Sequence, residues 1–505
     1  MKIRDDEFLR LDGALTETPR SQGGVPPGAC RPAWQSYREA DTDGGAAVPG
    51  LRNISNSSFF LKRIVLAGVV WTLSLTAAPA SGDDQENDEK KAPAATERSM
   101  GNELPGWVSL SGEFRGRFEG RRSLGYRKGN DDAYGLIRTR LDLGLTPASW
   151  LKFGFQGQDA SAPGIREGLP NIGVFRDGFD LRQAYAQVGS ENSPVTLTVG
   201  RQVLAYGDQR LVGALNWTNT SRAFDAVKLQ FRGDGARVDV FSAQVVQNDP
   251  AVRINRSMEG NNLHGVYGAI ENVIHGSTLE PYLLLRSAAS VVNELNQRGE
   301  LNRYTMGLRA WAKGLGPWDY NLALVRQWGD MAGAVIDAWG YYVELGYSIA
   351  AESSPRLYVH YNFGSGDEDG SDGRVGAFDN LYPTAHFHYG YNDLVGWRNL
   401  KNIRMGAEFK PHPKFGLTFD FHSFWLATGN DALYNVSGGL SVAPPPGGAT
   451  DLKVGNELDA MFTMAVSKAV NLGGGIGYLF PGPFLKANTP GDGNTFTYLV
   501  ASYRF

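Results

Sequence analysis

The sequence predicts an all-β protein, a single transmembrane antiparallel β-barrel of about 18 strands with short periplasmic turns and long extracellular loops. Three observations predict it. Apolar and polar residues alternate in many short segments, as in strands with one apolar and one polar face. The segments that connect them are alternately long and short along the chain. The last segment, 495–505 (TFTYLVASYRF), alternates in this way up to an aromatic C-terminal residue, although by itself it would equally suit the last strand of a soluble sandwich.

Composition narrows the class of protein. The chain has 505 residues, a net charge of −4, 64 glycines and one cysteine, Cys30. The absence of excess basic charge argues against nucleic acid as a partner. Only 64–80 approaches the length of a membrane helix, so a protein embedded in a membrane through the rest of this chain must form a closed barrel.

The N-terminal region predicts export. Residues 62–80 begin with Lys62-Arg63, continue with a short apolar core and end in Ala-Pro-Ala, which is the pattern of a secretory signal peptide. A single membrane anchor is the alternative. Residues 1–61 show no periodicity and predict a disordered leader of doubtful translation, and the charged stretch 81–106 predicts a disordered periplasmic spacer. A mature chain without Cys30 has no thiol, which suits an oxidising compartment.

The barrel is expected over 107–505. In 107–119, Val108, Leu110, Phe114 and Phe118 share one face, and the charged residues share the other. Two further strands, 137–146 and 151–158, repeat the pattern across a short turn at 147–150. The remaining strands are predicted near 180–188, 195–201, 224–231, 236–245, 263–271, 278–286, 303–312, 318–327, 339–348, 356–363, 402–411, 415–425, 454–466, 470–479 and 495–505.

The connections favour a barrel over a soluble sandwich, which has no reason to place every long loop at one end. Short turns are expected near 147–150, 189–194, 232–235, 272–277, 313–317, 349–355, 412–414 and 467–469. Long loops are expected near 120–133, 159–179, 202–223, 246–262, 287–302, 328–338, 364–401, 426–453 and 480–494. No blade repeat indicates a propeller. Tyrosine and tryptophan recur near strand ends, as at the boundaries of a membrane.

Charged residues on the predicted inner faces indicate a water-filled lumen, because unpaired charges are not buried away from water. Both basic and acidic residues line this lumen. The basic residues are Arg115, Arg117, Arg138, Arg140, Lys152, Lys228, Arg303, Arg309, Arg356 and Arg404, and the acidic ones are Glu113, Glu119, Asp142, Glu344, Glu408, Asp420, Glu457 and Asp459. Arginines clustered in a narrow tube favour an anionic solute. The alternative is a ladder of cross-strand ion pairs that stiffens the wall.

The sequence gives little support for a metal site or an enzyme. The stretch 364–373 (GSGDEDGSDG) is rich in aspartate but lacks the spacing of a calcium loop, so a solvated hairpin tip is favoured. His386 and His388 form an H-x-H pair without an evident third ligand. No GxSxG, phosphate-binding loop, HExxH or dinucleotide motif is present, so we expect no catalytic residue, metal or cofactor.

Two long loops and one strand carry a family resemblance. These are 199–226 (VGRQVLAYGDQRLVGALNWTNTSRAFDA), 378–397 (FDNLYPTAHFHYGYNDLVGW) and 138–145 (RTRLDLGL). They resemble the alginate-export family of outer-membrane porins, and the resemblance spans about 107–505. It implies an eighteen-stranded barrel in the bacterial outer membrane with an arginine-rich pore. It also implies passage of an acidic polysaccharide, driven by periplasmic export machinery.

The resemblance also implies site residues. By motif, the basic constriction with its acidic gating residue falls on Arg138, Arg140, Arg201, Arg210, Arg222 and Asp225, joined by Arg115, Arg117 and the lumen arginines Arg309 and Arg404. An outer loop that folds over or into the pore is expected around Asp379, Tyr382, His386 and Tyr389.

The sequence therefore favours an anion-selective outer-membrane channel for export of a uronate-type, alginate-like polysaccharide. Its partners would be outer-membrane lipid and the anionic polymer or a small anionic solute. The alternatives are a general or anion- or sugar-selective uptake porin, and a surface enzyme or adhesin built on a barrel.

Overall fold

The computed structural model describes residues 104–166, 172–190, 192–274 and 276–505. The predicted leader (1–61) and signal peptide (62–80) lie outside these residues, as does the predicted spacer (81–106) up to residue 103.

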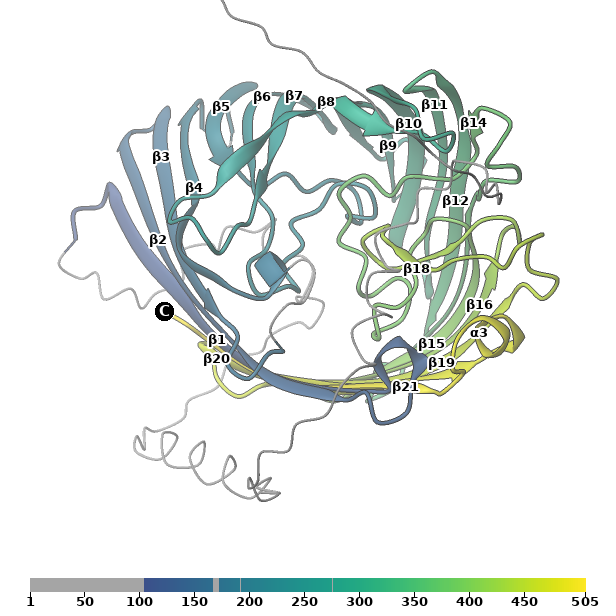
Figure 1. Cartoon of the computed structure of the whole chain (residues 1–505). Coiled ribbons are helices and arrows are strands. Elements are labelled where there is room, and N and C mark those ends of the chain that lie inside the picture. Colours follow the sequence, from purple (N-terminus) through teal and green to yellow (C-terminus); the bar gives the residue numbers. More distant parts are fainter. Residues whose placement is uncertain (1–103, 167–171, 191, 275) are drawn as a thin grey trace, which may run out of the picture. The chain divides into compact units, whose positions relative to one another are not determined.

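Eighteen antiparallel strands form one closed ring, so the predicted all-β barrel is confirmed (Figure 1). Each barrel strand pairs with the next along the chain, and β1 pairs with β21 to close the ring. Closure leaves no strand edge, which lipid requires because it cannot hydrogen-bond a free backbone group. The barrel strands are β1 (Val108–Arg122), β2 (Asp132–Ala148), β3 (Leu151–Ser161), β4 (Asp177–Val188), β5 (Val195–Gln202), β6 (Phe224–Gly233), β7 (Ala236–Gln247), β8 (Arg256–Glu271), β9 (Ser277–Val292), β10 (Arg298–Leu315), β11 (Trp318–Met331), β12 (Ala334–Ser348), β13 (Arg356–Gly364), β15 (Leu400–His412), β16 (Phe415–Leu426), β19 (Lys453–Ala465), β20 (Val470–Pro481) and β21 (Asn494–Arg504).

The other elements lie in the connections at one end of the barrel. They are the 3-10 turns η3 (Leu124–Tyr126) and η4 (Ile172–Val174), the short strands β14 (Arg374–Val375), β17 (Leu433–Tyr434) and β18 (Leu440–Val442), and the helix α3 (Pro483–Asn488). Among the described residues, no helix is long and apolar enough to cross a membrane.

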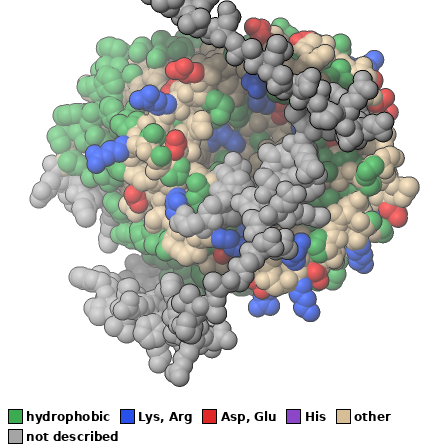
Figure 2. Space-filling model, in the orientation of Figure 1, with side chains coloured by type: hydrophobic (Ala, Val, Ile, Leu, Met, Phe, Trp, Pro, Cys, Tyr) green, Lys and Arg blue, Asp and Glu red, His purple; other side chains and the backbone are tan. Residues whose placement is uncertain are grey.

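The strand alternation separates two faces. On β1, Phe114 and Phe118 are each 48% exposed and point outward, whereas Arg115 and Arg117 are buried inside the barrel. Figure 2 shows hydrophobic side chains covering the outer flank, with basic side chains around the central hollow. The barrel is therefore apolar where it meets lipid and polar within.

The predicted strands are too short at the extracellular ends of β8 to β12. The connection between β9 and β10 is 293–297 rather than 287–302, and that between β11 and β12 is 332–333 rather than 328–338. The predicted lengths of these two loops are wrong. In both hairpins each face mixes polar or small residues with large apolar ones such as Val335 and Ile336, so the period-two signal that defines a strand from sequence is lost there.

Closure of the barrel depends on a small residue at Gly112. Its amide donates to the Phe505 carbonyl at 2.9 Å and its carbonyl accepts from the Phe505 amide at 3.1 Å. A Cβ at this position would lie 2.8 Å from the Arg140 carbonyl oxygen and against the Phe505 ring. The seam therefore leaves no room for a larger side chain.

We expect Gly112→Val to destabilise the folded barrel by about 1–3 kcal/mol, the usual cost of overpacking a filled site. The measurement is the thermal midpoint at which the heat-modifiable band shift on SDS gels is lost. Gly116→Val, on the same face of β1 but with no atom within 4 Å of the added Cβ, is the control and should leave the midpoint unchanged. Equal midpoints for the two variants would contradict this view of the seam.

Candidate pore and its internal plug

Four arginines lie side by side on the inner faces of β1 and β2. Arg115 opposes Arg138 directly, and Arg117 and Arg140 lie two residues away on their own strands. All four side chains are buried. Like charges at such positions repel, so each guanidinium requires a partner.

Part of that compensation comes from carboxylates on β1. Arg138 pairs with Glu113, with oxygen–nitrogen distances of 2.9 and 2.5 Å, and Arg117 pairs with Glu119 at 2.7 Å. The cross-strand ion pairs expected as the alternative role of these arginines therefore exist. They supply only two carboxylates for four guanidinium groups.

Besides Gln158 of β3, which accepts from Arg140 at 2.8 Å, these arginines contact oxygen atoms of a loop that lies inside the barrel. Arg115 donates to the carbonyls of Asn216 and Thr218 at 2.9 and 2.8 Å, and Arg117 donates to the Trp217 carbonyl at 2.6 Å. Arg140 donates to the Asn216 side-chain oxygen at 3.0 Å. Three successive carbonyls thus occupy the donors that a carboxylate-bearing solute would use.

This loop, 203–223, is joined inside the barrel to a second one, 376–399, and we call the two together the plug (Figure 1). The Tyr382 amide donates to the Leu211 carbonyl at 2.8 Å, and the Gly213 amide donates to the Tyr382 carbonyl at 2.9 Å. Arg222 donates from Nη1 to the carbonyls of Gly213, Tyr382 and Pro383. The two loops therefore form one hydrogen-bonded unit.

Arg210 fixes the first loop to the far wall of the barrel. It pairs with Asp208 at 2.8 Å, donates to the Asn362 oxygen at 2.8 Å and to the Tyr389 hydroxyl at 3.2 Å, and lies 4.0 Å from the Tyr342 ring centroid. Burial alone would raise the pKa of the Asp208 carboxyl, but the Arg210 and Arg309 guanidinium groups hold that pKa below its usual range. The carboxylate is therefore ionised at neutral pH.

Asp379 fixes the second loop in the same way. Its carboxylate lies 2.8 Å from Arg286 and 3.5 Å from Arg303, both on inner strand faces. Burial opposes ionisation of Asp379, but the Arg303 and Arg286 charges hold its pKa below the usual range. The loop that carries Asp379, Tyr382, His386 and Tyr389 thus lies inside the barrel. The expectation from the sequence is a loop that folds over or into the pore.

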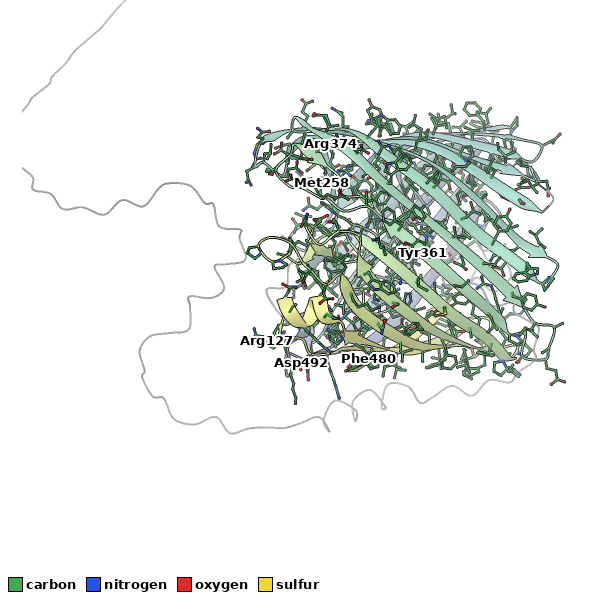
Figure 3. All side chains as sticks on the ribbon, turned by 90° about the vertical axis from the view of Figure 1, so that its right-hand side faces the viewer. Arg127, Met258, Tyr361, Arg374, Phe480 and Asp492 are labelled. Carbon is green, nitrogen blue, oxygen red and sulfur yellow. The ribbon has the colours of Figure 1, made fainter. Side chains whose placement is uncertain are left out.

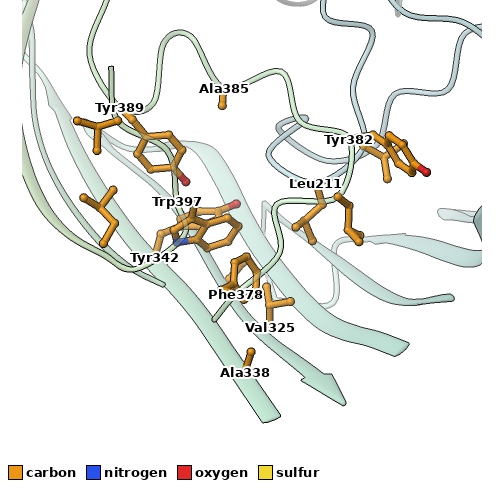
Figure 4. Close-up of a cluster of buried hydrophobic side chains, with 14 of the residues drawn as sticks. Leu211, Val325, Ala338, Tyr342, Phe378, Tyr382, Ala385, Tyr389 and Trp397 are labelled. Carbon is orange, nitrogen blue, oxygen red and sulfur yellow. The ribbon is translucent and has the colours of Figure 1, made fainter. Parts of the chain in front are cut away.

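Apolar packing completes the plug (Figure 4). Phe378 packs against Trp397 with ring centroids 4.8 Å apart, and Tyr389 stacks on Trp397 at 6.5 Å. Nearer β1, Trp217 stacks on His386 at 3.8 Å, and Arg117 lies 4.0 Å from the Trp217 ring centroid. His386 also contacts Asp393 at 2.8 Å.

The remaining predicted site residues lie in two different places. Arg309 and Arg404 are on the inner wall, where they pair with Glu280 and Asp420 at 2.8 Å. Arg201 and Asp225 pair with each other at 2.8 Å on the face opposite Phe224 and Ala226, which are buried inside the barrel. Their place in the pore, which is expected from the family motif, is corrected: strand alternation turns both side chains to the outer face.

Sequence reasoning missed the role of 216–218, because backbone carbonyls have no residue signature. One signal was available. Leu204, Tyr206, Leu211 and Val212 are large apolar residues in a long outer loop, and all four are buried in the plug. Apolar residues in a supposed surface loop indicate that it packs against something.

Two cavities lie inside the described part of the barrel. A cavity of about 110 Å³, which we call the vestibule, lies at the periplasmic end below the plug, lined by Glu113, Arg115, Arg117, Arg138, Trp217 and Arg504 among others. A smaller cavity of about 30 Å³ lies between Arg210 and Arg309. Among the described residues, no group of three or more His, Cys, Asp or Glu side chains is placed to hold a metal ion.

A closed, lipid-facing barrel with a charged lumen and a loop plug defines an outer-membrane channel of the porin type. The family described as alginate export matches residues 106–498, and the chain belongs to that family. It is a protein of the bacterial outer membrane.

Solved structures show the same fold at low identity. The outer-membrane protein OpdK of Pseudomonas aeruginosa is 12% identical with a TM-score of 0.55, and the match covers 79% of this chain and 98% of that one. Pseudomonas aeruginosa OccK3 (OpdO) is 13% identical with a TM-score of 0.52, covering 79% and 95%. A search of curated protein sequences found no significant match.

We expect Arg222→Ala to loosen the plug, because the carbonyls of Gly213 and Pro383 lose this donor at a cost of about 1–3 kcal/mol, while the Tyr382 carbonyl keeps the Gly213 amide. The measurement is single-channel recording in planar bilayers, where the open fraction should rise by about tenfold. Arg253→Ala, at an exposed position in the loop before β8, is the control. A correctly folded Arg222→Ala barrel with an unchanged open fraction would contradict the plug contact.

The outer loops should respond to pH through Glu294 and Asp367. Burial, with the Asp367 carboxyl beside it, raises the pKa of Glu294 to about 7 from a reference of 4.5. Between pH 4.5 and 7 the Glu294 carboxyl keeps its proton when the two loops are packed together but loses it when they separate. The contact between 293–297 and 365–373 therefore weakens as pH rises from about 4.5 through about 7. We expect amide hydrogen exchange of 293–297 and 365–373, corrected for intrinsic rates, to increase over that range. Glu294→Gln should remove the dependence, and Glu300→Gln, on exposed β10 surface, should keep it.

Proposed function

We propose that this channel exports an anionic, uronate-type polysaccharide of the alginate kind through its arginine-lined lumen. The observation that carries the proposal is the set of contacts between the β1–β2 arginines and the carbonyls of 216–218. Guanidinium groups bind carboxylates in a two-point geometry and with greater strength than they bind neutral carbonyls. A chain of uronates can therefore replace the loop oxygens one by one.

The position of the arginines suits a solute that arrives from the periplasm. The vestibule is bounded by the first residues of β1 and β20 and the last residues of β21, which lie at the end of the barrel with short turns. An acidic polymer entering there meets Arg115, Arg117 and Arg138 before it reaches the plug. We propose that displacement of the plug then opens the path outward.

A second candidate is uptake of small carboxylates. The space left by the plug, about 110 Å³ in the vestibule, admits a small solute more readily than a polymer. OpdK of Pseudomonas aeruginosa, which shares the fold, has been solved with vanillate. On this view the same arginines would bind a single carboxylate.

The test is current block in planar bilayers with compounds added on the periplasmic side. A short oligouronate should block the open channel, and a neutral oligoglucan of the same length should not. Arg115→Gln should raise the blocking concentration of oligouronate by about tenfold, because one charge-assisted contact is lost. Arg326→Gln, whose side chain pairs with Asp337 on the outer face, is the control and should leave block unchanged.

Three results would reject export of acidic polymer. Equal block by the neutral oligoglucan would indicate a channel indifferent to charge. A reversal potential showing cation preference would contradict the role of the arginines. Transport of a monomeric carboxylate without any block by oligouronate would favour the uptake channel.

A further inference from the structure

Two lysines and a tryptophan form a row on the outer face of the barrel. Lys401 of β15 opposes Trp425 of β16, which opposes Lys453 of β19. β15 begins at Leu400, β16 ends at Leu426 and β19 begins at Lys453, so the row lies at the extracellular ends of the strands. Figure 3 views this flank of the barrel, with Phe480 of the next strand labelled.

The strand alternation turns this row toward the membrane. Met405, Phe419 and Leu458, on the same face of the same strands, are 49%, 47% and 50% exposed. The opposite face carries Asn402 and Phe424, which are fully buried inside the barrel. The lysines therefore share a surface with residues that contact lipid.

The row has polar contacts but no carboxylate. The Lys453 ammonium lies 3.7 Å from the Trp425 ring centroid and donates to the Ser423 hydroxyl, which in turn donates to Asn456 Oδ1 at 2.8 Å. Within the part of the chain that the structure describes, neither lysine lies within 4.0 Å of an acidic side chain. The outward-facing Arg326 differs, since it pairs with Asp337.

We propose that Lys401 and Lys453 bind a phosphate group of an outer-leaflet lipid. Tryptophan rings concentrate where hydrocarbon meets head groups, which sets Trp425 at the level of lipid phosphates. Two lysines separated by one strand have Cα atoms about 10 Å apart, and their flexible stems can converge on one phosphate in front of Trp425. At the level of the head groups, an anionic phosphate supplies the negative charge that no acidic side chain provides to these two lysines.

The test uses the detergent-purified barrel and diphosphoryl lipid A, with binding measured by native mass spectrometry. Lys401→Gln/Lys453→Gln should weaken binding by roughly 10- to 30-fold, since each basic residue near an anionic lipid contributes about 1 kcal/mol. Lys414→Gln/Lys468→Gln, in the turns at the opposite end of the barrel, is the matched control and should bind as the native protein does. Retained heat-modifiable mobility on SDS gels shows that each variant is folded.

Competing ligands identify the source of the phosphate. Dephosphorylated lipid A should bind no more tightly to the native protein than to the double variant. Inorganic phosphate at millimolar concentration should leave lipid A bound, because it lacks the acyl chains that contact the outer face. Displacement by inorganic phosphate alone, or equal binding of lipid A by the native protein and Lys401→Gln/Lys453→Gln, would overturn the assignment.

Discussion

The compensation of four like charges on β1 and β2 organises the lumen. Arg115, Arg117, Arg138 and Arg140 lie close together and out of bulk water, where repulsion is weakly screened. Two glutamates on β1 compensate part of this charge, and the carbonyls of 216–218 supply much of the remainder. Without those carbonyls the arginines would require water or an anion, so the first plug loop is held where it is by the need to satisfy them.

The same balance explains how one structure can be closed and still suit an anionic solute. A backbone carbonyl carries only a partial charge, so its contact with a guanidinium is weaker than that of a carboxylate. The wall cannot yield, because each strand is hydrogen-bonded on both sides around the ring. Conformational change is therefore confined to the loops, which are tied to the wall by specific contacts such as Asp379 to Arg286 and Arg210 to Asn362.

The sequence predicted the barrel because a strand with lipid on one side and water on the other leaves a period-two pattern. It predicted the inner arginines on β1 and β2 for the same reason. It failed where that pattern is absent or interrupted. At the extracellular ends of β9 to β12 each face mixes polar and apolar residues, and Arg201 and Asp225 lie near strand ends where phase is ambiguous. The internal position of 203–223 depends on contacts with distant strands, which no local pattern records.

Strand phase gives basic residues on one strand opposite roles about 10 Å apart. Arg404 on β15 faces inward and pairs with Asp420, whereas Lys401, three residues earlier, faces outward without a carboxylate. Inside, fixed partners make the charge part of the wall or of the plug. Outside, Arg326 has a protein partner in Asp337, whereas the partner that we propose for Lys401 and Lys453 comes from the membrane.

The arginine cluster cannot by itself set the direction of transport. A binding site in a passive channel lowers the free energy of a solute equally whichever side it came from, so the vestibule explains selection and entry but not net flux. Net movement outward requires a higher concentration of polymer, or a force on it, at the periplasmic end. The structure is consistent with this division, because the arginines and the vestibule lie at that end and the plug packs directly against them. On the proposed export function, a polymer pushed from the periplasmic end exchanges its carboxylates for the loop carbonyls step by step, and the contacts of Asp379 and Arg210 with the wall are what would close the plug again behind it.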